Sequence, residues 1–163
     1  MYLRNEYIAF TATHPWNDEG TKMRYNHRME QHFIGKVATK AIIEKGGKIL
    51  MTRDHRDDAI WDLPGGRINA GESVEAGLRR EIQEELGVDV RFRRMVYSEQ
   101  LVHTGEGSSH LFITCEVTME NPEQPFRVPS EELAEVRWVD KNTIKELKTY
   151  DNCLRAINAF WKL

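Results

Sequence analysis

Apolar and polar residues alternate along the middle of the chain in the manner of β-strands. Residues 34–44 and 49–53 are rich in apolar and β-branched side chains, and the Lys-Gly-Gly-Lys turn at 45–48 predicts that they pair as a hairpin. Residues 110–118 predict another strand, and residues 88–103, which alternate loosely among arginines, predict one or two more. The pattern therefore indicates a sheet at the centre of the fold.

A helical pattern follows the hairpin. Over residues 74–86 the apolar positions recur at every fourth residue, at Val74, Leu78, Ile82 and Leu86. Ser73 is placed to cap the start of this helix, and Gly87 is placed to end it in a left-handed conformation. Further on, Asp140 should cap a helix at 141–147, and a last apolar stripe predicts a C-terminal helix: Cys153, Leu154, Ile157, Phe160 and Trp161.

Three glutamates share one edge of the helix predicted at 74–86. Glu81, Glu84 and Glu85 stand at positions i, i+3 and i+4, beside the apolar stripe. Carboxylates this close repel one another unless a cation compensates, and Mg²⁺ or Mn²⁺ prefers such oxygen ligands while keeping positions open for phosphate and water. The spacing thus predicts a catalytic metal site, with a solvated acidic face as the alternative.

The residues around these glutamates resemble the Nudix box, G-x5-E-x7-R-E-U-x-E-E-x-G-U, in which U is aliphatic. Residues 66–88 match it at every position, with seven fixed and two aliphatic residues in register. At average amino-acid usage such a match arises by chance on the order of once in 10⁸ starts or less often. The Trp-Asp-Leu-Pro-Gly-Gly string at 61–66 also resembles Nudix sequences. The chain is therefore identified as a member of the Nudix hydrolase family, of the MutT-like kind.

The resemblance implies roles for residues of the box. Glu84 and Glu85 would bind the metal, Glu81 would bind metal or act as the base, and the carbonyl of Gly65 would be a further ligand.

Other residues of the box would orient this site. Glu72 and Arg80 would brace the loop and the helix by ion pairing, and Gly66 opens the box. Mg²⁺ is the expected cofactor, with Mn²⁺ as a substitute.

The fold that the resemblance implies is α+β, an α/β/α sandwich with a mixed, partly curled β-sheet. We expect the Nudix domain at residues 34–163 and an arm at residues 1–33 that covers the cleft, contacts a second subunit or simply packs. Residues 131–139 resemble the late strand of Nudix domains, ahead of which a glutamate often completes the metal site. Glu132 is the candidate, with Glu131 and Glu135 as alternatives.

Cationic and imidazole side chains outside the box are candidates for substrate binding. Arg53, at the end of a predicted strand, and Arg56 could hold phosphates, or form exposed salt bridges. His103 and His110 flank a turn and could contact a base ring or supply a general base, or be ordinary surface histidines.

Composition narrows the function classes. A formal net charge of −3 does not favour general binding to polyanions, so a nucleic-acid coat, a role in cutting RNA 5′ ends or a membrane-surface role is not expected. Cys115 and Cys153 match no metal or redox spacing and are expected as buried thiols. No apolar run approaches the roughly 18 residues of a membrane span, and no signal sequence is visible, so we expect a cytoplasmic protein.

The expected reaction is hydrolysis of a diphosphate linkage in a nucleoside diphosphate joined to another group. Some Nudix subfamilies that act on ADP-ribose or dinucleoside polyphosphates carry a marker proline or tyrosine near positions 103–105, which here are His103, Thr104 and Gly105. This favours a nucleoside triphosphate cut to monophosphate and pyrophosphate. A nucleotide-sugar hydrolase is the alternative enzyme, and a regulatory nucleotide-binding domain is the alternative of another class. A homodimer is suggested by the arm and by the family.

Overall fold

The computed structural model describes residues 33–55, 60–102, 109–128 and 132–162. These all belong to one compact unit, Phe33–Leu163. The arm expected at residues 1–33 therefore lies, except for Phe33, outside the described residues.

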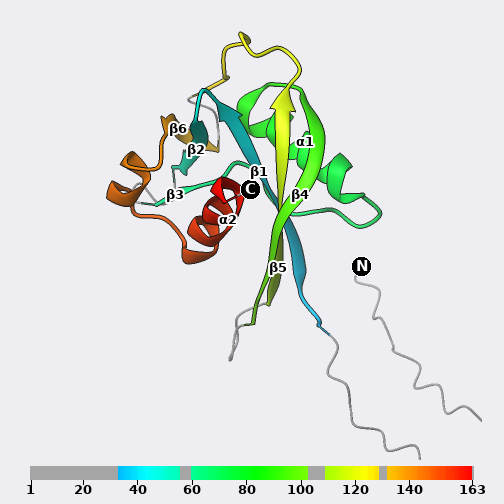
Figure 1. The fold of residues 1–163 in the computed structure, drawn as a ribbon. Coiled ribbons are helices and arrows are strands. Elements are labelled where there is room, and N and C mark those ends of the chain that lie inside the picture. Colours follow the sequence, from blue (N-terminus) through cyan, green and yellow to red (C-terminus); the bar gives the residue numbers. More distant parts are fainter. Residues whose placement is uncertain (1–32, 56–59, 103–108, 129–131, 163) are drawn as a thin grey trace, which may run out of the picture. The chain divides into compact units, whose positions relative to one another are not determined.

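The strands of the sheet are β1 (Lys36–Lys45), β2 (Lys48–Asp54), β3 (Trp61–Asp62), β4 (Val90–Leu101), β5 (His110–Met119) and β6 (Leu133–Val139). The sheet is mixed and divides into two parts that share strand β1. The N-terminal part of β1 runs parallel to β5, with Lys36 opposite His110 and Ile43 opposite Val117, whereas Glu44 and Lys45 pair antiparallel with β2. Strand β4 pairs antiparallel with β5, and β3 and β6 both pair with β2. Because β1 changes partner along its length, the sheet curls without closing (Figure 1).

Local sequence signals set both ends of the first helix, α1 (Val74–Leu86), as predicted. The Ser73 hydroxyl accepts a hydrogen bond from the Ala76 N–H at 3.1 Å, and Gly87 ends the helix at a φ of 70°. The C-terminal helix is α2 (Asp151–Trp161). Within the described residues no helix has the length and apolar character needed to cross a bilayer.

One sequence prediction needs correction, and another is made more definite. Residues 141–147 form only the short 3-10 helix η1 (Thr143–Glu146). Asp140 does cap this segment, since its carboxylate accepts from the N–H groups of Asn142 and Thr143, each at 2.9 Å. The helix does not extend further, because the next residue, Lys148, uses its carbonyl to accept from the Trp61 N–H at 2.9 Å. Of the one or two strands predicted over residues 88–103, the described residues 88–102 form one, β4, whose length is accommodated by two register shifts against β5.

Two hydrophobic cores lie on opposite faces of the sheet, one under each helix. The core under α1 contains Leu78, Ile82 and Leu86, together with Ala41 and Ile43 of β1. The core under α2 contains buried residues from β1, β2, β6 and α2, among them Ile42, Met51, Val139, Cys153 and Ile157. Both cysteines are buried free thiols, as expected. The predicted α/β/α sandwich is thus confirmed, with α1 and α2 on either side of the sheet (Figure 1).

The glycine-rich segment 64–68 docks along the edge of β1 that β5 leaves open. Three backbone hydrogen bonds join them: from the Thr39 N–H to Gly66 O at 2.8 Å, from Ala41 to Pro64 O at 2.8 Å, and from Ile68 to Val37 O at 3.0 Å. At the centre of this contact Gly65 has a φ of 123°, and a Cβ there would collide with the carbonyl oxygen of Thr39. Only glycine fits both the conformation and the space.

Substitution of Gly65 by alanine tests this constraint. We expect G65A to lower the free energy of unfolding by at least about 2 kcal/mol, because positive φ and a backbone collision act together. Urea denaturation measures the loss. The matched control is G71A in the same loop, where φ is also positive at 85° but no atom lies within 4 Å of the added Cβ. It should cost about 1 kcal/mol, and equal losses in the two variants would contradict the collision.

Candidate active site

A cavity of about 560 Å³ lies beside the docked glycine segment. Its walls come from β1 and β2, the 60–67 segment, α1, the start of β6 and the residue that precedes α2. Two cationic side chains, Lys40 and Arg67, line it against five acidic ones: Asp54, Asp62, Glu81, Glu85 and Glu132. The cavity therefore has an excess of negative charge.

Glu85 is a carboxylate of this cavity with a perturbed pKa. It lies on α1, and its Oε2 accepts a hydrogen bond from the Gly65 N–H at 2.7 Å. Burial raises the pKa of Glu85 to about 7; Glu81 and Glu132 repel the charged form further, while Lys40 and the Gly65 N–H favour it. Glu85 thus faces the cavity as a carboxylate whose charge is incompletely compensated.

Lys40 brings a positive charge into the interior of the sheet. Its Nζ lies 2.8 Å from Asp62 Oδ2, 2.8 Å from Gly65 O and 3.1 Å from Leu63 O, so all three ammonium protons have acceptors. Burial alone would lower the pKa of Lys40, but the negative charges of Asp62 and Glu85 outweigh it and the pKa is raised. Sequence analysis missed this residue, although a lysine within an apolar strand was a usable signal.

Arg80 gathers the carboxylates on the outer side of α1. Its guanidinium contacts Glu72 through two nitrogens at 2.8 and 3.0 Å, Glu81 Oε1 at 2.8 Å and Glu84 Oε2 at 2.9 Å. It also donates to the Arg67 carbonyl at 2.9 Å. The ion pair with Glu72, which the resemblance implied, is present. The hydrogen bonds from Arg80, with that from the Asn69 N–H, lower the pKa of Glu72 to about 2.

The other two glutamates of the triplet differ in exposure. The Glu81 side chain is 13% exposed, lines the cavity and lies against Gly66, where any Cβ would collide with its carboxylate. The Glu84 side chain is 53% exposed, points to Arg80 and is not part of the cavity wall. Gly66 thus makes room for Glu81, and one member of the predicted triplet stands outside the cavity.

Of the predicted site residues outside the Nudix box, some line the cavity and others do not. Glu132 lines the cavity and interacts electrostatically with Glu85, whereas Glu135 pairs with Arg53 at 3.1 Å. That pair lies outside the cavity wall, to which β2 contributes Thr52 and Asp54 instead. Arg56, His103 and Glu131 lie outside the described residues.

His110 also stands away from the cavity. It is the first residue of β5, stacks on Phe112 with 5.8 Å between ring centroids and lies opposite Lys36. Because Lys36 is four residues from Lys40, its backbone is about 13 Å from that of Lys40 along β1.

The donor chemistry of the cavity fits a hard divalent cation. Glu81, Glu85 and Glu132 offer carboxylate oxygens in one acidic cavity, and burial together with the charges of Glu81 and Glu132 raises the pKa of Glu85, so a further cation there would favour its charged form. Among the described residues no three acidic, histidine or cysteine side chains already converge on one point. A cation would therefore be bound with rotation of side chains, Glu81 leaving Arg80.

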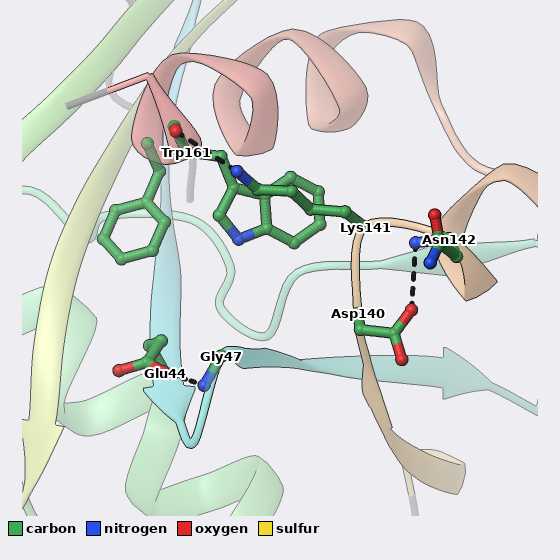
Figure 2. Close-up of a pocket in the computed structure, with 7 residues that line it drawn as sticks. Glu44, Gly47, Asp140, Lys141, Asn142 and Trp161 are labelled. Carbon is green, nitrogen blue, oxygen red and sulfur yellow. Dashed lines mark hydrogen bonds between the residues drawn. The ribbon is translucent and has the colours of Figure 1, made fainter.

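A second cavity, of about 410 Å³, lies beside the β1–β2 turn (Figure 2). Glu44 and Gly47 of that turn face Asp140, Lys141 and Asn142, and α2 adds Phe160 and Trp161. It contains none of the predicted site residues. The acidic cavity is therefore the candidate active site.

Comparison with known proteins agrees with the box. The sequence profile of the NUDIX domain matches residues 35–157, which is more than half of the chain. The chain therefore belongs to the NUDIX domain family.

The relatives described here share limited sequence identity with this chain or match only part of it. Nudix hydrolase 5 of Arabidopsis thaliana is 26% identical over 121 residues, covering 71% of this chain and 38% of that protein. The CTP pyrophosphohydrolase of Escherichia coli (strain K12) is 40% identical over 63 residues, or 37% of this chain and 47% of that protein. The chain spans about two fifths of the length of curated relatives such as the first. A solved UDP-X diphosphatase superposes with a TM-score of 0.68 over 83% of this chain and 66% of its own, at 16% identity, which supports the fold.

The raised pKa of Glu85 predicts a pH-dependent stability difference. A carboxyl with a pKa of about 7 when folded and 4.5 when unfolded stabilises the fold fully below pH 4.5, and this contribution is lost as the pH rises through 7. The uncharged E85Q variant keeps an oxygen for the Gly65 N–H. In EDTA it should gain stability over wild type between these pH values, reaching roughly 3 kcal/mol at most.

Urea denaturation across pH 4 to 8 measures this difference. E75Q, on the first turn of α1, is the matched control and should run parallel to wild type. Parallel profiles for E85Q as well would contradict the assigned environment of Glu85.

Proposed function

We propose that this protein is a Nudix hydrolase that cuts the diphosphate linkage of nucleoside diphosphate derivatives with Mg²⁺ as cofactor and Mn²⁺ as a substitute. The observation that carries the proposal is that Glu81, Glu85 and Glu132 line the wall of one acidic cavity beside the docked glycine segment. Membership of the family and an intact box support hydrolysis in preference to binding alone.

Glu81 and Glu85 would hold the metal in this proposal. Glu84, once it leaves Arg80, and the Gly65 carbonyl are the further ligands that the resemblance implies. A divalent cation at this position supplies charge neutralisation for the diphosphate and a lowered pKa for water.

The chain's own residues supply the remaining roles. Glu81 or Glu132 takes the proton of the attacking water, whose oxygen forms a bond to one phosphorus as the anhydride P–O bond breaks. Arg67 lines the cavity and makes no side-chain ion pair with another described residue, so its guanidinium is available to a phosphate. Arg80 and Glu72 orient the loop against the helix through their bidentate pair. We keep Arg53, His103 and His110 as weaker candidates for substrate binding.

A nucleoside triphosphate is the proposed substrate, cut to monophosphate and pyrophosphate. The similarity to the CTP pyrophosphohydrolase supports this class, as do the residues at positions 103–105. Apolar lining from Ile60, Leu133 and the ring of Tyr150, which is 48% exposed, gives a base a surface to contact. A nucleotide sugar is the alternative substrate. The homodimer and the cytoplasmic location stay predictions.

The reaction is tested by phosphate and pyrophosphate release from the purified protein. The panel is nucleoside triphosphates, nucleotide sugars, ADP-ribose and dinucleoside polyphosphates, with Mg²⁺ and with EDTA. We expect Mg²⁺-dependent turnover that E85Q lowers by at least about 10²-fold, the scale of losing one electrostatic group at a reacting centre. The E75Q variant, which removes a glutamate charge from the same helix outside the cavity, should keep wild-type turnover.

Absence of turnover on every compound, with nucleotide binding that survives E85Q, would identify a non-catalytic binding domain. If turnover is highest on nucleotide sugars, the proposed hydrolase activity stands, but a nucleotide sugar becomes the substrate in place of a nucleoside triphosphate.

The Tyr150 ring is tested separately with the best substrate of this panel. If the ring contacts the base, Y150A should raise KM by about tenfold with little change in kcat, since stacking holds the nucleotide without touching the phosphates. Y150F, which keeps the ring and loses the hydroxyl, should resemble wild type. A fall in kcat at unchanged KM in Y150A would place the effect elsewhere.

A further inference from the structure

The backbone N–H and the carbonyl of Gly65 both make hydrogen bonds to side chains. Its N–H donates to Glu85 at 2.7 Å, and its carbonyl accepts from Lys40 Nζ at 2.8 Å. The resemblance assigns that carbonyl to the metal, yet a cation of the chain itself already occupies it.

Lys40 is firmly held in this position. Its other two protons go to Asp62 Oδ2 at 2.8 Å and to Leu63 O at 3.1 Å, and only 16% of its side chain is exposed. Withdrawal would leave an unpaired charge on Asp62 or on the ammonium in a poorly solvated place, which is unfavourable. We therefore expect Lys40 to keep its position when a metal ion binds, which an exposed lysine would not.

We propose that Lys40 acts as a built-in cation of the active site: it takes the Gly65 carbonyl and weakens the binding of divalent metal to the free protein. The metal is then held by the glutamates, and it binds well only when the phosphates of the substrate add their negative charge. This inference rests on the proposed function and concerns how this chain tunes the metal affinity of that site.

Electrostatics gives the direction of the effect. Lys40 and a metal held by Glu85 would be close neighbours, because Lys40 Nζ lies 2.8 Å from the Gly65 carbonyl oxygen and Glu85 accepts from the N–H of the same residue at 2.7 Å. Inside a cavity with restricted solvent, repulsion between a single and a double charge at such close range changes an affinity by on the order of tenfold or more. Lys40 also neutralises Asp62, which would otherwise attract the metal.

The test is Mn²⁺ binding in the absence of nucleotide, followed by the electron paramagnetic resonance signal of free Mn²⁺. K40M replaces the ammonium by an uncharged chain of similar length, and K40Q keeps a hydrogen-bond donor for the Gly65 carbonyl. Both should bind Mn²⁺ more tightly than wild type, on the order of tenfold. K40Q keeps the test valid if K40M fails to fold, which circular dichroism would reveal.

The matched control is K36M, which removes the same charge from an exposed position on the same strand. At about 0.1 M salt its charge is screened from the cavity and its Mn²⁺ affinity should equal that of wild type. Addition of a non-hydrolysable nucleotide should strengthen Mn²⁺ binding more in wild type than in K40Q.

Unchanged or weaker Mn²⁺ binding in both Lys40 variants would overturn the inference and make Lys40 a clamp of the glycine segment alone. If wild type still hydrolyses its substrate with Mg²⁺, that result leaves the proposed function intact. A wild type that neither hydrolyses any compound nor binds Mn²⁺, with or without nucleotide, would overturn both proposals.

Discussion

Backbone pairing between β1 and residues 64–68 is the constraint on which the candidate site depends. Strand β1 is fixed along one edge by β5, and its other edge receives the glycine segment through the N–H groups of Thr39 and Ala41 and the carbonyl of Val37. The segment consequently has one register relative to the sheet. Gly65 permits the close approach, and from this position its N–H meets Glu85 of α1 while its carbonyl meets Lys40. A helix, a strand and a loop thus converge on one peptide residue.

Two cationic side chains, Arg80 and Lys40, compensate most of the carboxylates around Gly65. Glu81, Glu84 and Glu85 would repel one another on one helix edge, but Arg80 contacts the first two, together with Glu72. Lys40 acts on the inner side, where it neutralises Asp62 and partly offsets Glu85. The remaining negative charge lies in the wall of the cavity, where the proposed Mg²⁺ and the diphosphate of the substrate would bind.

Features set by neighbouring residues could be predicted from the sequence, whereas contacts between residues distant in the sequence could not. The caps Ser73 and Gly87 act within one turn of α1, so the sequence predicts its bounds correctly. The helix expected at 141–147 is capped by Asp140 as predicted, but it is only a short 3-10 helix because Lys148 pairs with the distant Trp61. Arg53 was a candidate phosphate ligand with a salt bridge as the alternative; it pairs with Glu135, its neighbours Thr52 and Asp54 line the cavity, and its role towards phosphate stays a prediction. Because β2 is apolar on both faces, its sequence gives no indication of which residues face the site.

The sequence by itself determined the family, the helix that carries the glutamates and the chemical type of the expected ligands, because these depend on spacing within one helical turn or one short loop. Only the tertiary structure decided which carboxylates share a cavity: Glu132 joins Glu81 and Glu85, Glu84 turns outward, and Tyr150 stands in the same wall. It also decided that Lys40 reaches the Gly65 carbonyl. Such contacts depend on strand register and helix packing, which the free energy of the whole fold selects and no local pattern encodes.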